Sequence, residues 1–355
     1  MDVRILEKEC RTLAAAGFDV VLVAPGASEP RENIRIVSVA RPRNRLTRML
    51  VTTWAVVIRA LRERGVVYHF HDPELLPLAF LLGLGGKIVV YDAHEDLPDQ
   101  IATKDWIPAV LRRPVGRLMG LAMRLFVRPL SGVVAATPTV ARRFPQSRTA
   151  VVRNYPLLHE FSRTSSYSRD SNSVVYVGSV TAERGAREMV DAFGHVTHSG
   201  ARLRIAGPIH PPRLEREMEE RRGAERVDLL GRTDRAGVAD LLADARAGLV
   251  VLHPTPSHLP SMPVKLFEYM AAGVPVVASD FPMWREYVED AGTGIAVDPL
   301  DPAAIAEAVD WIFDHPEEAE EMGRRGRVLV DERWSWDPEG VRLVDFYDLI
   351  VGESA

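Results

Sequence analysis

The sequence predicts an α/β protein of two doubly wound parallel-sheet domains with a cleft between them, and three observations predict it. The chain has 355 residues, more than a single hydrophobic core usually serves. Short runs rich in Val, Ile and Leu alternate with longer amphipathic stretches, which is typical of strands covered on both faces by helices. The Ser-rich stretch 162–173 interrupts this alternation, which then starts again. We therefore predict domains over 1–160 and 173–335, followed by a final helix within 336–355.

The first half of the chain begins with a helical pattern over 4–16. The apolar run DVVLVA at 19–24 predicts a buried strand that the dipeptide Pro25-Gly26 ends. Residues 46–64 predict a helix with Arg on its outer face. The other predicted strands are near-continuous apolar runs at 34–40, 66–70, 87–91 and 132–136.

The second half repeats this order after the linker. Its predicted strands are 174–178, 203–206, 227–230, 248–252 and 274–279. Its predicted helices are 183–196, 211–222, 236–245 and 262–272, with a last one at about 337–350. In such sheets ligands bind beyond the carboxyl ends of the strands.

One element of this pattern is missing at the start. A sheet of this type normally opens with a central strand and a Gly-containing loop before its first helix. Here Asp2 and Arg4 already lie at the N-terminus of the first predicted helix. We expect the true start of the protein to lie upstream of Met1.

Composition excludes several classes of protein. The single cysteine, Cys10, cannot form an internal disulfide or a thiolate metal cluster, which favours a reducing compartment. No signal-like stretch or membrane-spanning apolar run is present, so we expect a cytoplasmic protein. Residues 1–155 carry 23 basic and 14 acidic residues, and the remainder carries 21 and 35. This asymmetry indicates that the two halves meet different partners.

The segment PSMPVKLFEYMAAG at 260–273 is the most informative one. We expect Ser261 to cap a helix and Pro263 to fit its first turn, which leaves free N–H groups that attract phosphate. Lys265 and Glu268 are three residues apart and share one helical face, as a cation for a diphosphate and a carboxylate for sugar hydroxyls would. The alternative is an ion pair on a solvated helix.

The run PVKLFEYMAAGVPVVASD resembles the donor-site signature of the retaining glycosyltransferases of family four, the group 1 glycosyltransferases. The resemblance extends, in the right order, over further segments. They are DVRILEKECRTLAAAG at 2–17, HFHDPELLP at 69–77, YDAHEDLP at 91–98, YVGSVTAERG at 176–185, RIAGP at 204–208 and GIAVDP at 294–299.

This resemblance implies the GT-B architecture, with two Rossmann-like domains: the first for an acceptor, the second for a nucleotide-diphosphate sugar. It also implies that the final helix packs back on the first domain. Glu268 matches the second Glu of the family's E-x7-E motif and is expected to hold the donor ribose, whereas the first Glu is replaced by Pro260. The loop expected to meet the donor sugar and phosphate comprises Ser261, Met262, Pro263 and Val264.

The family's first phosphate motif is altered in this chain. It reads Gly178-Ser179 and Arg184-Gly185 where the family often has Gly-Arg and Lys-Gly. Arg184 keeps a cation that binds phosphate in a bidentate manner, whereas Ser179 loses one. Lys265, one of only four lysines, is expected to compensate.

His94 is the candidate catalytic residue. It follows the strand 87–91, and the family's cleft His occupies the corresponding place near the transferred sugar. We expect Asp92 or Glu95 to orient its imidazole and raise its pKa. The alternative is a histidine satisfied within a loop.

A second histidine group precedes it along the chain. His69 and His71 flank Phe70, and we expect them to point to opposite faces of the strand, with one near the cleft beside Asp72. Structural roles are the alternative for both histidines. Although His and carboxylates gather here, H-x-H with dispersed acids is a weak metal signature, so we expect no metal and no cofactor.

A basic amphipathic stretch covers 106–130, with five Arg, no acidic residue, and Trp, Leu, Met and Phe between them. Such a stretch suits peripheral contact with the inner face of an anionic membrane. A first-domain helix with a solvated Arg face is the alternative. Because Pro114 interrupts the pattern, we predict one helix to about 112 and a second from about 115.

The function predicted is that of a metal-independent, retaining hexosyl- or N-acetylhexosaminyltransferase. It would move a sugar from a nucleotide-diphosphate donor to a glycan, glycolipid or natural-product acceptor, and no nucleic acid is an expected partner. Two alternatives remain: a non-catalytic glycosyltransferase-like scaffold, and a GT-B sugar-nucleotide epimerase. A nicotinamide dehydrogenase is disfavoured because no G-x-G-x-x-G opens a strand–helix unit.

Overall fold

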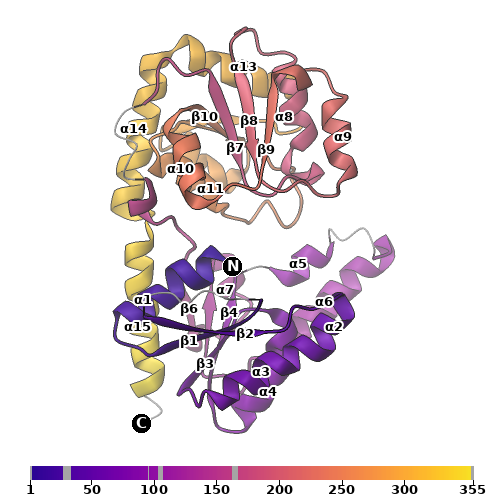
Figure 1. The fold of residues 1–355 in the computed structure, drawn as a ribbon, viewed down its shortest axis with the longest axis vertical. Helices are drawn as coiled ribbons and strands as arrows, with labels where there is room; N and C mark the ends of the chain where they lie inside the picture. The colour runs from indigo at the N-terminus through magenta and orange to yellow at the C-terminus, as the bar shows by residue number, and fades with distance from the viewer. Residues whose placement is uncertain (1, 27–32, 95, 103–106, 162–166, 353–355) are drawn as a thin grey trace. The chain divides into compact units, whose positions relative to one another are not determined.

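A computed structural model describes residues 2–26, 33–94, 96–102, 107–161 and 167–352. The chain divides into two compact units (Figure 1). The first unit runs to Asn154 and takes up the chain again at Trp336, and the second unit is Tyr155–Ser335. Every strand pair that the structure describes is parallel, which confirms the predicted α/β class.

The strands of the first unit form two separate sheets. A two-stranded sheet pairs β1 (Val20–Pro25) with β2 (Ile34–Val39). A four-stranded sheet has the order β3 (Val67–Phe70), β4 (Ile88–Ala93), β5 (Gly132–Ala135) and β6 (Thr149–Val151). All four residues of β5 are buried, as expected of a strand covered on both faces.

Helices cover both faces of these strands. Figure 1 shows α1 and α15 on one side of them and α3, α4 and α6 on the other. The helical segments of this unit are η1 (Arg4–Cys10, π-helical), α1 (Arg11–Ala15), α2 (Arg45–Thr47), η2 (Arg48–Thr52, π-helical), α3 (Thr53–Arg62), η3 (Pro73–Leu75), α4 (Leu76–Leu84), α5 (Leu97–Ala102), α6 (Ala109–Phe126), α7 (Pro138–Ala141), η4 (Gln146–Arg148) and α15 (Trp336–Gly352).

The prediction of two helices around Pro114 is wrong, because α6 runs through this residue without a break. A proline inside a helix leaves the carbonyl four residues earlier without its donor. That residue is Val110, whose side chain is 83% exposed, so water can replace the missing donor. The helix therefore continues over residues 109–126 of the basic stretch.

The final helix, α15, belongs to the first unit. Trp336 Nε1 donates to Thr12 Oγ1 at 2.8 Å, and the ring of Phe346 packs on Gly132, where an added Cβ would lie 2.3 Å from it. Tyr347 Oη lies 2.7 Å from His69 Nδ1 on β3. These contacts tie α15 to α1, β3 and β5, which precede it by more than two hundred residues.

The second unit is built on one six-stranded sheet. Its order is β12 (Gly294–Val297), β11 (Val276–Ser279), β10 (Ala245–Val250), β7 (Ser173–Val177), β8 (Arg202–Ala206) and β9 (Val227–Gly231). Its helical segments are η5 (Leu158–Phe161), η6 (Ala182–Arg184), α8 (Ala186–Phe193), α9 (Arg213–Glu219), η7 (Ala224–Arg226), α10 (Arg235–Ala243), α11 (Val264–Ala271), α12 (Pro282–Val288), α13 (Pro302–Asp314) and α14 (Pro316–Arg333). The two central strands, β7 and β10, are buried at every position.

Close packing in this core sets where glycine is required. At Gly248 of β10 an added Cβ would lie 2.2 Å from the ring of Tyr269, which is fully buried on α11. The hydroxyl of Tyr269 accepts a 2.8 Å hydrogen bond from the N–H of Val177. The helix α11 is thereby fixed against the carboxyl end of β7. Among all described residues, no helix is long and apolar enough to cross a lipid bilayer.

Candidate functional site

The strand order of the second unit reverses between β7 and β10. From β7 the chain adds β8 and β9 on one side, and from β10 it adds β11 and β12 on the other. Ligands of open parallel sheets bind at such a switch point, in the crevice beyond the carboxyl ends of the two strands. The loops that leave these strands are 178–185 and 251–263. The sequence prediction placed the donor site on these two loops and on the start of α11.

The loop after β7 depends on two glycines. Gly178 has a φ of 121°, and Gly185 has a φ of 76°. An added Cβ at Gly185 would lie 2.2 Å from the carbonyl oxygen of Val251, so the two loops approach backbone to backbone. An added Cβ at Gly178 would lie 3.2 Å from Lys265 Nζ. The structure thus brings Gly178 and Lys265 together, and their predicted role in donor binding stays a prediction.

Lys265 is the most unusual cation of this site. Its side chain is only 8% exposed, and within the described ranges its ammonium has no hydrogen-bond partner. It lies 3.5 Å from the centre of the Tyr176 ring. Burial, and then the positive charge of Arg184, lower the pKa of Lys265 well below its ordinary value.

Arg184 lies close to this ammonium. Its Nη1 donates a long hydrogen bond of 3.4 Å to the carbonyl oxygen of Ser179. The carbonyl of Ser179 also accepts a 2.8 Å bond from the hydroxyl of Tyr176. Two basic groups therefore meet at the switch point, and neither has a carboxylate within ion-pair distance in the part of the chain that the structure describes.

The expected cap of α11 is wrong. The helix begins at Val264, its N-cap is Pro263, and no side chain caps it. Ser261 lies two residues before that N-cap, and its hydroxyl donates instead to the carbonyl of His258 at 2.8 Å. Trp284 Nε1 donates to the carbonyl of Ser261 at 2.7 Å, and Met262 packs on the core. The loop before α11 is thus held by its own backbone and by Trp284.

Glu268 is buried in the same helix, with 7% of its surface exposed. Its Oε1 accepts a 2.8 Å hydrogen bond from Arg235 Nη1. Arg235 also pairs with Glu160. The expected ribose carboxylate therefore already has a charged partner, which lies 33 residues away in the sequence.

The first unit holds a second polar group at the carboxyl ends of its strands. Asp92, fully buried on β4, accepts two hydrogen bonds from Arg4 at 2.9 and 3.0 Å and one contact of 3.1 Å from His71 Nδ1. His94 Nδ1 lies 3.7 Å from the same carboxylate. Burial pushes the pKa of Asp92 up, but Arg4, His71 and His94 outweigh it and hold the pKa well below its usual range. Asp92 thus brings His71 and His94 together.

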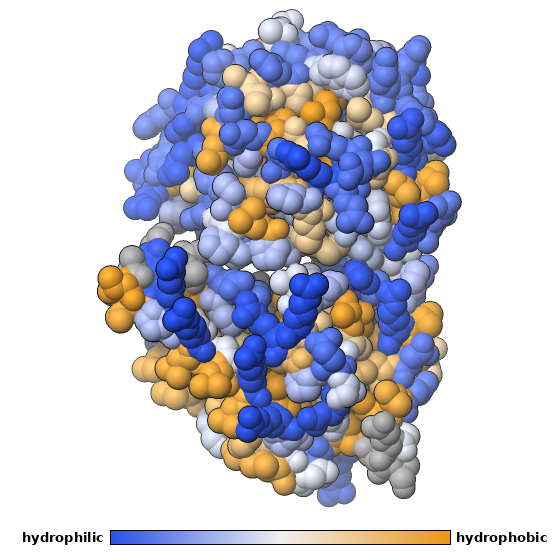
Figure 2. All heavy atoms as spheres, turned by 180° about the vertical axis from the view of Figure 1, so that it is seen from behind, coloured by the Kyte–Doolittle hydropathy of each residue, from blue (hydrophilic) through white to orange (hydrophobic). Residues whose placement is uncertain are grey.

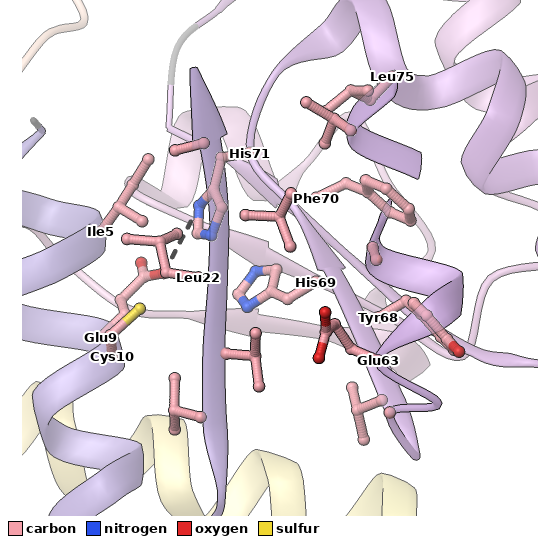
Figure 3. Close-up of a pocket in the computed structure, with 18 of the residues that line it drawn as sticks. Ile5, Glu9, Cys10, Leu22, Glu63, Tyr68, His69, Phe70, His71 and Leu75 are labelled. Carbon is pink, nitrogen blue, oxygen red and sulfur yellow. Dashed lines mark ion pairs between the residues drawn. The ribbon is translucent and has the colours of Figure 1, made fainter. Parts of the chain in front are cut away.

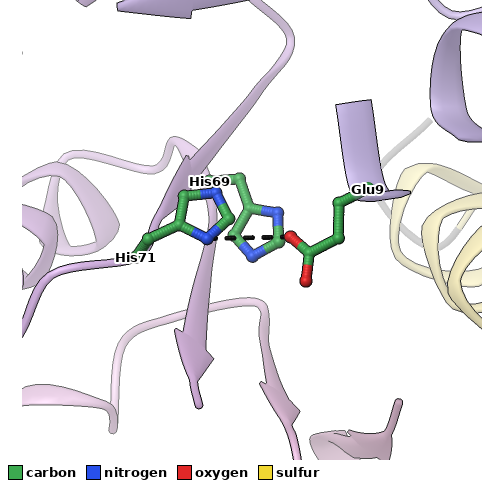
Figure 4. Close-up of side chains that lie close together, drawn as sticks. All are labelled: Glu9, His69 and His71. Carbon is green, nitrogen blue, oxygen red and sulfur yellow. Dashed lines mark ion pairs between the residues drawn. The ribbon is translucent and has the colours of Figure 1, made fainter. Parts of the chain in front are cut away.

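The prediction for His69 and His71 is wrong. Their rings stack with centroids 4.4 Å apart, because residues two apart on a strand share one face (Figure 4). Burial lowers the pKa of His69 well below its usual value. For His71 burial also acts downward, but the hydrogen bond to Asp92 and the charge of Glu9 raise its pKa overall.

Two predicted residues stand apart from this group. Asp72 has a side chain that is 58% exposed and lies 3.5 Å from Arg48 Nη2, so it is not part of the buried cluster. Glu95 lies outside the described residues, and its expected role stays a prediction. The role predicted for His94 also stays a prediction.

Glu9, His69 and His71 are close enough to be considered as metal ligands, since one ligand atom from each lies within 4.8 Å of the others (Figure 4). Arg4 Nε lies 2.9 Å from Glu9 Oε1, however, so a cation already neighbours this carboxylate. A metal ion there would meet the charge of Arg4. The three residues fit a metal poorly, and the absence of a metal from the reaction stays a prediction.

Comparison with known proteins decides the family. The profile described as Glycosyltransferase Family 4 matches residues 3–154, and the profile described as Glycosyl transferases group 1 matches residues 160–329. The chain belongs to the group 1 glycosyltransferases. The resemblance predicted from the sequence is confirmed.

Named relatives of this glycosyltransferase act on different sugars. Alpha-D-kanosaminyltransferase of Streptomyces kanamyceticus is 29% identical over 182 residues, which cover 50% of this chain and 46% of that protein. The alignment thus spans about half the length of that relative. D-rhamnosyltransferase WbpZ of Pseudomonas aeruginosa is 26% identical over 290 residues, covering 75% of this chain and 68% of the relative.

Solved structures show the fold. Sucrose-phosphate synthase from Thermosynechococcus elongatus has a TM-score of 0.79 at 19% identity, covering 97% of this chain and 92% of the other. Anabaena HepE in complex with UDP has a TM-score of 0.68 at 14% identity, covering 89% and 87%. The GT-B fold implied by the resemblance is therefore confirmed for this glycosyltransferase.

Sequence reasoning missed four charged residues of this glycosyltransferase. They are Arg4 and Glu9 in the first unit, and Glu160 and Arg235 in the second. Arg4 and Glu9 were assigned to an amphipathic helix, where charged side chains normally face water. Their burial follows from partners far along the chain, so no local signal could have found them. Arg235 directly follows Asp234, which caps α10, so in the sequence it resembles any other residue of a first helical turn.

Proposed function

We propose that the chain transfers a sugar from a nucleotide-diphosphate sugar to an acceptor, with retention of configuration and without a metal. The observation that carries the donor assignment is the pair of cations at the switch point of the second unit. Lys265 is buried without a hydrogen-bond partner among the described residues, and Arg184 lies beside it. A buried ammonium in this state is costly unless a ligand anion completes it.

The proposed role of the two cations follows from the reaction. Breaking the bond between sugar and diphosphate leaves negative charge on the diphosphate. Preorganised cations stabilise this charge without a reorganisation cost, and removing one such donor typically lowers the rate by about 10²–10³-fold. Gly178, with no side chain, lets the diphosphate approach the backbone of the loop after β7.

The proposed role of Glu268 is to hold the ribose. Arg235 binds Oε1 and so fixes the direction of this carboxylate. A ribose hydroxyl would donate a hydrogen bond to this carboxylate. We propose that His94 acts toward the sugar or the acceptor, and that the sugar is a hexose or an N-acetylhexosamine.

The test is binding and transfer with UDP, GDP, dTDP and their sugars. Stabilisation by each nucleotide is measured as a rise in the melting temperature, which follows the logarithm of ligand concentration over Kd. We expect Arg184→Ala and Glu268→Gln to abolish the rise for the nucleotide that binds. Arg187→Ala is the matched control, because Arg187 pairs with Glu217 on the surface.

The outcomes separate the competing functions. If both variants transfer sugar from every donor as the parent chain does, the donor site is misplaced. Nucleotide binding without transfer would favour the scaffold alternative. Conversion of a sugar nucleotide in the absence of any acceptor would favour the epimerase.

For the acceptor we propose a glycolipid at an anionic membrane surface on its cytoplasmic face. The helix α6 exposes five large apolar side chains. They are Val110, Leu111, Leu118, Leu121 and Leu125. Exposed Arg113, Arg117 and Arg124 lie among them. Lipid acyl chains accept the apolar residues and anionic headgroups accept the guanidinium groups.

A second exposed apolar row lies in the same unit, on η2 and α3. It contains Met49, Leu50, Val51, Trp54 and Ile58. Figure 2 shows apolar side chains interleaved with hydrophilic ones over the lower half of the view, where the first unit lies. Exposed apolar patches of this kind mark an interaction site.

Vesicle sedimentation tests this surface. We expect binding to vesicles of phosphatidylglycerol and none to phosphatidylcholine at the same salt. Leu118→Ser with Leu121→Ser should weaken binding at least tenfold, because each buried apolar side chain contributes about 1.5–3 kcal/mol. Equal binding by this double variant and the parent chain would show that α6 is only a solvated helix.

A further inference from the structure

Histidine rings lie near the carboxyl ends of strands in both units, but they meet different groups. In the first unit, His69 and His71 line a cavity of about 920 Å³ (Figure 3). Their Nδ1 atoms lie 2.7 and 3.1 Å from oxygen atoms of the same unit. In the second unit, His258 belongs to the loop 251–263, between β10 and α11. Of these three rings, that of His258 lies at the proposed donor site.

The loop of His258 is held against the loop that carries Arg184. The N–H of His253 donates to the carbonyl of Glu183 at 2.8 Å, so the two loops join directly beside Arg184. The carbonyl of His258 accepts from the N–H of Ser261 at 3.0 Å and from its hydroxyl at 2.8 Å. The half-buried ring of His258 is thereby held close to the charges of Glu183 and Arg184.

One ring nitrogen of His258 has a fixed role. Its Nδ1 lies 3.1 Å from the carbonyl oxygen of His253. A carbonyl oxygen can only accept a hydrogen bond, so Nδ1 carries a hydrogen. Burial lowers the pKa of His258, and the positive charge of Arg184 lowers it further, so the ring is uncharged at neutral pH. In an uncharged ring with its hydrogen on Nδ1, the other nitrogen, Nε2, is an acceptor.

This acceptor is open to a ligand. Among the residues that the structure describes, none makes a hydrogen bond or an ion pair with Nε2 of His258. His253 differs, because its Nε2 lies 3.1 Å from Glu188 Oε2. A ligand that meets Nε2 of His258 must supply an N–H or O–H group. Ionised phosphate oxygens are acceptors and cannot do so, whereas sugar hydroxyls can.

We propose that His258 determines which donor sugars fit, by accepting a hydrogen bond at Nε2 from a hydroxyl of the sugar. The inference rests on the proposed donor site, in which Arg184 and Lys265 bind the diphosphate. The sugar is bonded directly to that diphosphate, so an acceptor beside Arg184 faces the sugar. The ribose hydroxyls are assigned to Glu268 on α11. A site that accepts from a hydroxyl disfavours the analogue that lacks it, because the acceptor is then left without a partner.

The test removes the acceptor and keeps the anchor of the ring. In His258→Asn the side-chain amide takes the place of Nδ1 and can still donate to the carbonyl of His253, but nothing replaces Nε2. The matched control is His195→Asn, at an exposed histidine of the same unit. Titration calorimetry gives Kd for UDP, GDP and dTDP, and for the glucosyl and mannosyl derivatives of the nucleotide that binds. The tighter sugar nucleotide is then compared with analogues that each lack one sugar hydroxyl.

In the parent chain we expect one analogue to bind about 2- to 12-fold more weakly than the intact sugar nucleotide, which is the range of one neutral hydrogen bond. His258→Asn should bind this analogue and the intact sugar nucleotide equally, whereas His195→Asn should still distinguish them. Kd for the free nucleoside diphosphate should be the same in His258→Asn as in the parent chain. If His258→Asn does not fold, His258→Phe takes its place, since it keeps a ring and has no acceptor.

Two results would overturn the role of His258 alone. One is a variant that distinguishes the analogues as the parent chain does. The other is a variant that loses affinity for the free nucleoside diphosphate as much as for the sugar nucleotide, because the ring would then act on the diphosphate or on the loop. A parent chain that binds none of the nucleotides would instead overturn the proposed donor site itself.

Discussion

Lys265 offers the sharpest test of the donor site, because its ammonium should act in opposite directions in the free and the bound protein. In the free protein it is 8% exposed, lies over the Tyr176 ring at 3.5 Å and has no hydrogen-bond partner among the described residues. Leaving a buried polar group unsatisfied costs about 1–3 kcal/mol, and more when it is charged. A bound diphosphate would accept charge-assisted hydrogen bonds from the ammonium and so remove this cost.

The variant Lys265→Met removes the amine and keeps an unbranched side chain of similar volume. We expect the free energy of unfolding of the second unit to rise by about 1–3 kcal/mol, because the buried amine is gone. Affinity for the nucleoside diphosphate should fall, since a hydrogen bond to a charged group contributes about 1.5–3 kcal/mol. This corresponds to a rise in Kd of about 10- to 150-fold.

Denaturant unfolding and titration calorimetry measure the two quantities. The control is Lys87→Met, which removes an exposed lysine of the first unit and should change neither. A variant that is less stable and binds as tightly as the parent would refute the reasoning, because Lys265 would then be a packing contact on Tyr176.

The difference in stability between Lys265→Met and the parent chain should change with pH in a definite direction. Folding holds the pKa of Lys265 well below its value of 10.5 in the unfolded chain. Between these two values the unfolded chain binds more protons than the folded one, so the stability of the parent chain rises with pH. The difference in stability between Lys265→Met and the parent should therefore shrink as the pH rises toward 10.5. A difference that is constant over this window would contradict a buried, titrating amine.

Three further predictions concern stability. Arg4→Met leaves the buried carboxylate of Asp92 on β4 without its cation and should lower the free energy of unfolding by about 3–5 kcal/mol. Arg11→Met, at an exposed arginine, should change it by less than about 0.5 kcal/mol. Equal effects of the two substitutions would show that the buried ion pair is dispensable. Burial, and then the charge of Asp92, raise the pKa of Glu9 from 4.5 to about 7. The stability that protonated Glu9 contributes is therefore present at pH 4.5 and is lost as the pH rises through 7. Over this range the parent chain should lose about 3 kcal/mol of unfolding free energy relative to Glu9→Gln in denaturant titrations, and parallel pH profiles of the two proteins would contradict the raised pKa. Gly248→Ala places a methyl group 2.2 Å from an aromatic ring and should cost about 1–3 kcal/mol in thermal unfolding, so an unchanged melting temperature would mean that α11 can shift.

The fold was predictable because parallel strands buried on both faces appear in the sequence as continuous apolar runs. Residues 174–177 (VVYV) are of this kind, and all of them are buried in β7. The exception at α6 has a physical reason. Pro114 would break a helix whose carbonyls are shielded, but this one is exposed to water, and exposure is a tertiary property that the sequence pattern does not contain.

Part of the candidate site was predictable from the alternation of strands and helices, because the carboxyl ends of neighbouring parallel strands bring the following loops together. Gly178 and Lys265 come together because both lie next to the switch point that the strand order fixes. The partner of Glu268 was not predictable, since Arg235 approaches from another helix and one arginine among many carries no distinguishing mark. The burial of Glu9 was not predictable either, because it depends on strands that come much later in the sequence.

The path of the chain through the first unit sets the order in which the protein is built during translation. The first unit is complete only when Trp336 has reached Thr12 and Tyr347 has reached His69, pairs that are 324 and 278 residues apart. By then every residue of the second unit, Tyr155–Ser335, has left the ribosome. The second unit should therefore fold first, although it is synthesised second, while the early strands wait with their apolar edges exposed. The apolar strand edges of the first unit thus stay without their final cover while about half of the protein is synthesised.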